Sequence, residues 1–136
     1  MSETLSILVV DDNPAMANSL RDVLELKGLI AYAASSGGEA LKILHDHPVD
    51  VMVTDVIMPE MDGVALYRAA RKVYPQLITL LMTAYAADEL IQQGMKEGIK
   101  TVINKPIDID LLLSLFSATK RVLKKTGQLT SGSIKI

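Results

Sequence analysis

Short apolar segments alternate with amphipathic helical segments five times along this chain, and this alternation constrains the fold more than any other feature. Each apolar segment is nearly continuous, which is typical of a strand buried on both faces of a parallel sheet. Between them, apolar residues recur at helical spacing. The expected strands and helices alternate as residues 5–10, 14–27, 29–34, 39–45, 49–54, 64–73, 77–82, 87–96, 101–103 and 109–125.

This order of elements predicts the fold class. Strands that alternate with helices form a parallel sheet, and right-handed crossovers place the helices on both of its faces. We therefore predict an α/β fold with a doubly wound, five-stranded parallel sheet. The expected topology is flavodoxin-like (βα)5 with strand order 2-1-3-4-5.

Turn and cap residues mark several element ends. Pro14 suits the first turn of a helix, and Gly28 suits the position after its last residue. The Ser-Gly-Gly sequence at residues 36–38 is expected to separate the second strand from a helix that begins at Glu39. Asp62 is expected to cap the third helix, with Gly63 easing the turn.

Composition sets the broad class of the protein. A chain of 136 residues with 49% hydrophobic content and no cysteine can form one core without disulfides or a thiolate metal site. We expect one domain over residues 1–125, followed by a flexible tail or linker over residues 126–136. The net charge of −2 disfavours direct nucleic-acid binding. With no signal-peptide pattern and no membrane-length apolar stretch, we expect a cytoplasmic location and no membrane association.

Reactive side chains follow four of the five expected strands. Asp11 and Asp12 follow the first, Asp55 the third, Thr83 the fourth and Lys105 the fifth. In a sheet of order 2-1-3-4-5, ligands bind beyond the carboxyl ends of the strands, where the strand order reverses between the first and third strands. The predicted topology therefore gathers three carboxylates, a hydroxyl and an ammonium at one edge.

Three neighbouring carboxylates repel one another unless a cation neutralises them. Carboxylate oxygens with a few waters suit Mg²⁺, which often binds phosphate as well. A carboxylate can also act as a nucleophile and carry a covalent phosphoryl group, and Asp55 is the candidate because its strand is central. Lys105 and Thr83 come from neighbouring strands and can neutralise phosphoryl oxygens. Taken singly, the aspartates could simply cap a helix or form a turn; the complete set favours a site.

Four sequence segments resemble the receiver domain of two-component response regulators, in the CheY-like superfamily. They are Asp11-Asp12, the segment TDVIMPEMDG at residues 54–63, the segment MTA at residues 82–84 and the segment NKP at residues 104–106. The resemblance spans residues 5–125 in the expected order and spacing, which is more specific than any single short motif.

The resemblance implies a role for each matching residue. Asp55 would take a phosphoryl group from a sensor histidine kinase or a histidine phosphotransfer protein. Asp12, Asp55 and the backbone carbonyl of Ile57 would bind Mg²⁺ directly, with Asp11 acting largely through water. Thr83 and Lys105 would hold phosphoryl oxygens, and the bond before Pro106 would be cis.

The resemblance also implies a switch. Phosphorylation would change the face formed by the fourth helix, fifth strand and fifth helix, and so the binding of an effector or a second copy of the chain. Leu111 and Leu113 extend the apolar surface of the fifth helix, which favours such contacts. Many receivers carry a switching aromatic residue where this chain has Val102. Tyr85 and Ile57 lie two residues after Thr83 and Asp55, where they would flank the site and control access of water.

Two other functions compete with a signalling receiver that catalyses only its own phosphotransfer and slow dephosphorylation. An interaction module that is never phosphorylated would not need the complete acidic set. A Mg²⁺-dependent aspartyl phosphohydrolase commonly has a second acidic residue two positions after the nucleophile, where this chain has Ile57. A nucleotide carrier is disfavoured because an acidic pair, and not a glycine-rich loop, follows the first strand. His45 and His47 are expected to be surface residues, not ligands.

Overall fold

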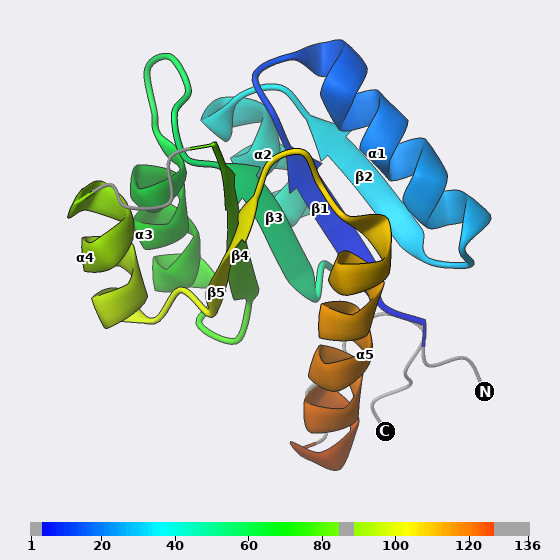
Figure 1. Ribbon diagram of the computed structural model, residues 1–136. Coiled ribbons are helices and arrows are strands. Elements are labelled where there is room, and N and C mark those ends of the chain that lie inside the picture. The colour runs from blue at the N-terminus through cyan, green and yellow to red at the C-terminus, as the bar shows by residue number, and fades with distance from the viewer. Residues whose placement is uncertain (1–3, 85–88, 127–136) are drawn as a thin grey trace.

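The computed structural model describes residues 4–84 and 89–126 and contains one parallel sheet within these ranges (Figure 1). The sheet has the order β2-β1-β3-β4-β5, which confirms the predicted topology. Its strands are β1 (Ser6–Val10), β2 (Ile30–Ala34), β3 (Val51–Asp55), β4 (Ile78–Thr83) and β5 (Thr101–Asn104). The helices are α1 (Pro14–Leu26), α2 (Gly37–Asp46), α3 (Gly63–Val73), α4 (Glu89–Glu97) and α5 (Ile109–Thr126).

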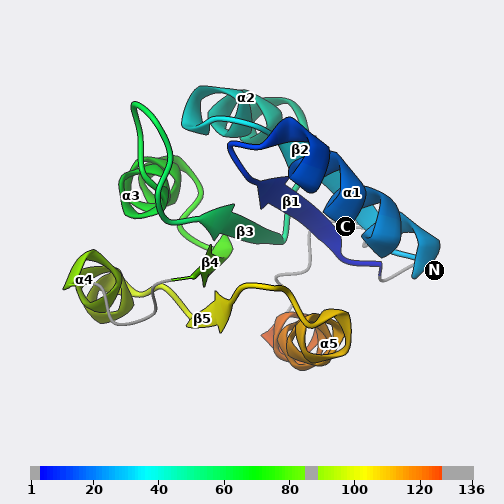
Figure 2. The same ribbon diagram turned by 45° about the horizontal axis from the view of Figure 1, so that its top comes forward.

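Alternate side chains of each strand enter opposite faces of the sheet, and each face has its own helices (Figure 2). Ile7 and Val9 pack with α1 and α5, whereas Leu8 and Val10 pack with α2 and α3. A further cluster lies between β4, α3 and α4. The central strands are buried on both faces, which explains why their sequences are almost continuously apolar.

Observed and expected element ends differ by at most two residues, and α2 shows why they can differ. This helix begins at Gly37, two residues before the expected start, so the two glycines belong to its first turn. The side chain of Ser36 accepts a hydrogen bond from the backbone nitrogen of Glu39 at 3.1 Å and so caps the helix. The expected start of α4 at residue 87 lies outside the described residues, as do tail residues 127–136.

The fifth helix packs as its apolar stripe predicts. Leu112 and Phe116 are fully buried against β1, β3 and β4, and Leu113 and Leu115 are partly buried against the same cluster. Leu111 is 48% exposed and so remains available to another molecule. Among the described residues, no helix combines the length and the apolar character needed to cross a bilayer.

The end of α1 yields a stability prediction. Gly28 has a φ of +90°, where a side chain is strained, and its nitrogen donates to the carbonyl of Glu25 at 3.0 Å. We expect Gly28→Ala to lower the free energy of unfolding by roughly 1 kcal/mol, measured by urea denaturation. Alanine restricts the unfolded chain, which raises stability, but the strain of alanine in the left-handed conformation is larger.

Gly38 is the matched control, because it lies in the first turn of α2 and a β carbon there meets only the Ser36 hydroxyl at 3.9 Å. Gly38→Ala should leave stability unchanged or raise it by roughly 0.4–1 kcal/mol. Equal effects of the two substitutions would contradict the assignment of strain to Gly28.

Candidate functional site

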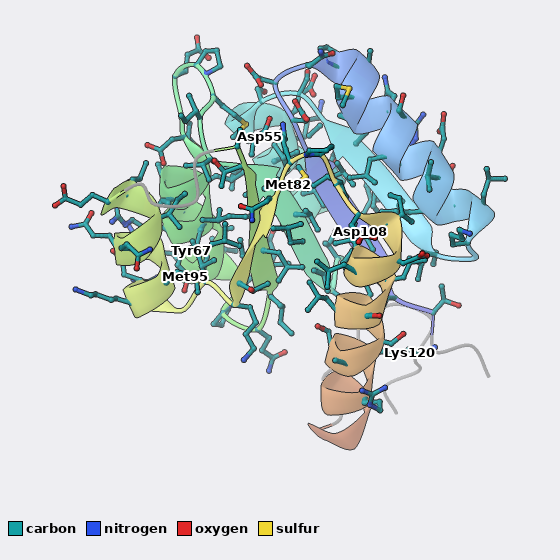
Figure 3. The ribbon with its side chains drawn as sticks, viewed as in Figure 1. Asp55, Tyr67, Met82, Met95, Asp108 and Lys120 are labelled. Atoms are coloured by element: carbon teal, nitrogen blue, oxygen red, sulfur yellow. The ribbon has the colours of Figure 1, made fainter. Side chains whose placement is uncertain are left out.

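The parallel register brings the expected site residues to one edge of the sheet. Val10 pairs with Thr54 in the adjacent strand, so Asp11 and Asp55 follow neighbouring strand positions. Asp55 pairs with Met82, and Thr83 pairs with Asn104, which places Lys105 just beyond β5. Asp55 lies at this edge in Figure 3. Strand order and register therefore assemble groups that are far apart in sequence.

Lys105 holds the two buried carboxylates of the site. Its Nζ atom lies 2.5 Å from Oδ1 of Asp55 and 3.2 Å from Oδ2 of Asp11. Both aspartates are only 5% exposed, so neither charge is well solvated. Thr83 is also 5% exposed at the end of β4, and its carbonyl accepts a hydrogen bond from the backbone nitrogen of Lys105 at 2.9 Å.

The two carboxyl groups have opposite pKa shifts. Burial raises the pKa of Asp55 to about 7; the neighbouring Asp11 adds to this rise, while Lys105 opposes it. For Asp11, burial also acts to raise the pKa, but hydrogen bonds with Asp55 and Lys105 outweigh burial and lower it. Two adjacent carboxylates are difficult to ionise together, and a further cation would favour the charged form of both.

The turn after β1 orients Asp11 and leaves Asp12 exposed. Oδ1 of Asp11 accepts a hydrogen bond from the backbone nitrogen of Asn13 at 2.9 Å. The Asn13 side chain in turn accepts from the backbone nitrogens of Ala15 at 3.0 Å and Met16 at 3.4 Å. Asn13 therefore caps α1, which contradicts the alternative that Asp11 or Asp12 caps this helix. We did not single out Asn13 from the sequence, although its position directly before Pro14 is typical of a cap.

Three carboxylates in this edge fit a metal ion. Asp11, Asp12 and Asp55 each offer an oxygen, and these oxygens all lie within 4.8 Å of one another. An all-oxygen set of this kind suits a hard divalent cation better than zinc or copper. The buried members also leave uncompensated negative charge, because the single Lys105 ammonium faces two of them. The cluster can therefore bind a metal ion.

Close packing fixes the loop between β3 and α3. The nitrogen of Gly63 donates to the carbonyl of Val56 at 2.7 Å, and a β carbon at Gly63 would collide with the carbonyl oxygen of Asp55. Gly63 is therefore needed for close approach rather than for a turn conformation. Asp62 caps α3 by accepting from the nitrogen of Ala65 at 2.8 Å, as expected. The helix start thus lies directly against the strand end that carries Asp55.

The structure describes three of the four remaining expected residues. The side chain of Ile57 is 61% exposed, and the Lys105-Pro106 peptide bond is cis. Val102 is partly buried against the cluster between β4, α3 and α4. Tyr85 lies outside the described residues. The roles of these residues stay predictions.

An apolar cleft of about 600 Å³ borders the acidic centre between α1 and the segment that follows β5. Its walls include Met16 and Leu20 from α1 and Ile107 opposite them, and Asp11 and Lys105 also line it. His45 and His47 lie elsewhere, beside a hollow formed with residues 73–77, and both are exposed as expected. The histidines therefore do not belong to the acidic site.

A model of the response regulator receiver domain family matches residues 7–117. The chain belongs to this family. It is therefore a receiver domain of two-component response regulators, a signalling module and not a conventional enzyme. The solved response regulator receiver domain protein (CheY-like) from Methanospirillum hungatei has a TM-score of 0.84 and 27% identity to this receiver, over 90% of this chain and 98% of that one.

Curated relatives place similar receivers within longer proteins. The transcriptional regulatory protein GlrR of Escherichia coli is 30% identical over 91% of this chain, and the match covers 27% of GlrR. The sensor histidine kinase RcsC of Salmonella typhimurium is 31% identical over 92% of this chain, and the match covers 13% of RcsC. This receiver therefore spans about a quarter or less of these two relatives.

Glu60 gives a prediction for the loop of the site. Its φ is 69°, the left-handed region that costs a non-glycine residue roughly 1–2 kcal/mol. Glycine removes this strain, but it also makes the unfolded chain more flexible, which lowers stability by roughly 0.4–1 kcal/mol. We expect Glu60→Gly to raise the free energy of unfolding by roughly 0.5 kcal/mol in urea denaturation.

Glu60→Val is the matched comparison, because a β-branched side chain tolerates this conformation least. It should destabilise the receiver. If the glycine and valine variants have the same stability, the backbone at residue 60 is not strained.

Proposed function

We propose that Asp55 accepts a phosphoryl group and that this receiver works as a phosphorylation switch. The observation that carries the proposal is the position of Asp55 at the end of the central strand, buried, with the Lys105 ammonium 2.5 Å from its carboxylate. Membership of the receiver family and the intact set Asp11, Asp12, Thr83 and Lys105 support it.

The donor in this proposal is a phosphohistidine on a sensor histidine kinase or a histidine phosphotransfer protein. An Asp55 oxygen bonds to phosphorus as the bond from phosphorus to the donor imidazole nitrogen breaks, and the imidazole leaves with the electron pair. The Lys105 ammonium then pairs with a phosphoryl oxygen in place of an Asp55 oxygen. The Thr83 hydroxyl donates a hydrogen bond to another phosphoryl oxygen.

Mg²⁺ is the cofactor we propose for the acidic cluster. Asp12, Asp55 and the carbonyl of Ile57 would hold the ion directly, with Asp11 acting through water. When bound, Mg²⁺ supplies positive charge against the phosphoryl oxygens. The donor set of three carboxylates within 4.8 Å of one another supports this choice of a hard cation.

The output in this proposal is a change in the face formed by α4, β5 and α5. Two exposed apolar side chains, Leu111 in α5 and Met95 in α4, give this face contact area for an effector or for a second copy of the receiver. We further propose that residues 1–125 form the receiver unit, that it acts in the cytoplasm and that it does not bind nucleic acid directly. Slow hydrolysis of the phosphoryl group at Asp55 would reset the switch.

Phosphorylation is tested with acetyl phosphate and Mg²⁺. We expect intact-mass spectrometry to show one added phosphoryl group, which Asp55→Asn abolishes because the amide is not a nucleophile of the same kind. Asp108→Asn is the matched control. Asp108 is exposed and its side chain accepts from the nitrogen of Leu111 at 3.2 Å, a cap that asparagine also provides, so this variant should be phosphorylated normally.

A wild-type receiver that gains no phosphoryl group under these conditions and binds no beryllofluoride would instead be an unphosphorylated interaction module. Sustained turnover of a phosphate monoester would indicate a phosphohydrolase. Each alternative thus has its own readout in the same preparation.

Mg²⁺ binding is tested by thermal unfolding. At a Mg²⁺ concentration ten times the dissociation constant, the ion should stabilise the native receiver by about 1.4 kcal/mol. Asp12→Asn should remove most of this stabilisation without disturbing the core, because Asp12 is exposed. Asp22→Asn, an equally conservative change at an exposed position of α1, should retain it. Equal Mg²⁺ responses in the two variants would refute the assigned metal site.

A further inference from the structure

The apolar cleft that borders the acidic centre has no role in the proposed function. Its volume of about 600 Å³ is typical of pockets that bind small molecules. Apolar side chains of α1, of the segment after β5 and of the first residue of α5 line it, and they are Met16, Leu20, Val23, Ile107 and Ile109. We call this hollow the α1 cleft.

The alternation of side chains along the strands places the acidic centre on the same side of the sheet as the α1 cleft. Val9 and Val53 lie on the face that α1 and α5 cover. Asp11 and Asp55 come two residues later, and alternate residues of a strand share a face. Met82, which pairs with Asp55 in the adjacent strand, also lines the α1 cleft (Figure 3). The cleft therefore reaches the strand ends that carry the acidic centre.

Charge is confined to one part of the α1 cleft. Its charged lining residues are Asp11 and Lys105, which both belong to the acidic centre. The Lys105 ammonium also contacts Asp55, so an anionic group that pairs with Lys105 lies beside the proposed phosphoacceptor. Met16 is 55% exposed, so the cleft is open to solvent at this residue. The ligand that matches this lining has an anionic head and a short apolar chain.

The chemistry proposed for Asp55 has a reactant of this kind. In an acyl phosphate, a phosphoryl group is joined to a carboxylate that carries an alkyl chain. When Lys105 pairs with a phosphoryl oxygen, the chain is attached only a few bonds away from it. Because Lys105 itself lines the α1 cleft, the chain can enter the cleft and leave water.

We propose that the α1 cleft binds the alkyl chain of a small-molecule phosphodonor, so that this receiver reacts faster with medium-chain acyl phosphates than with acetyl phosphate. This inference rests on the proposed function of Asp55. An Asp55 carboxylate oxygen bonds to phosphorus, the bond from phosphorus to the acyl oxygen breaks, and the alkyl carboxylate leaves with the electron pair. A carboxylate replaces a carboxylate, so no proton is transferred.

The number of methylene groups in the donor sets the size of the expected effect. A methylene that is wholly buried strengthens binding roughly fourfold. The α1 cleft is open to solvent at Met16, so we expect roughly a twofold gain for each methylene. Hexanoyl phosphate has four methylenes more than acetyl phosphate and should react roughly 15-fold faster at concentrations below saturation.

Phosphorylation by acetyl, butyryl and hexanoyl phosphate tests this preference in the full chain. The three donors release carboxylates of nearly equal basicity, so their intrinsic reactivity is almost the same. Intact-mass spectrometry follows the added phosphoryl group over time in the presence of Mg²⁺. The rate constants should rise with chain length. Equal rate constants for the three donors would overturn the proposal.

Two exposed methionines provide matched variants. Met16 lines the α1 cleft from α1, whereas Met95 lies on α4 and does not line it. Glutamine is similar in length to methionine but has a polar end. Met16→Gln should lower the ratio of the hexanoyl to the acetyl rate constant roughly threefold, because the cleft loses apolar contact area. Met95→Gln should keep the wild-type ratio. The same ratio in both variants would contradict the assigned cleft.

Binding of alkyl phosphonates separates the cleft from the function of Asp55. A phosphonate has a similar anionic head, but its phosphorus is bonded to carbon and is not transferred. In NMR titrations with Mg²⁺, the receiver should bind pentylphosphonate roughly 15-fold more tightly than methylphosphonate. Equal affinities would overturn the proposal. Absence of an adduct with every acyl phosphate would refute the function of Asp55, whereas an adduct that forms equally fast with each would refute only the role of the cleft.

Discussion

The carboxylates of Asp11 and Asp55 meet at the carboxyl edge of the sheet, where both are buried. The Lys105 ammonium pairs with both and so offsets the cost of burying them. Burial of a charge is unfavourable unless it is paired. Burial raises the pKa of Asp55 to about 7 and the neighbouring Asp11 adds to this rise, whereas the hydrogen bonds of Asp11 lower its own pKa. A second cation would therefore stabilise the charged form of the site. The Lys105 ammonium is already present and can exchange one oxygen partner for another.

The apolar core makes this arrangement possible. Each central strand contributes side chains to both faces of the sheet, so a shift of one residue would exchange the side chains of the two faces and disrupt the packing of both. The register is therefore fixed, and the first polar residue after each strand has a fixed place at the edge. Gly63 fixes the start of α3 in the same way, because its backbone packs directly on the Asp55 carbonyl. Rigid packing thus determines which polar groups can meet.

Sequence reasoning succeeded where the chemistry repeats along the chain. Asp55 and Lys105 were placed correctly because each follows an apolar strand and parallel strands end at one edge. It failed at α2, which begins at Gly37 because the Ser36 side chain caps the helix and outweighs the low helix propensity of glycine. The contacts of Glu97 with Tyr67 and Arg68 had no local signal, since these partners on α3 lie some thirty residues away in sequence. Contacts of this kind arise only from tertiary packing.

Val102 limits how the acidic site can communicate with the outer face of the receiver. A valine in this strand packs with the cluster of Leu81 and Ile91 but has no ring that could turn between a buried and an exposed position. A side-chain rotation at residue 102 therefore cannot carry a change from the acidic site to the outer face.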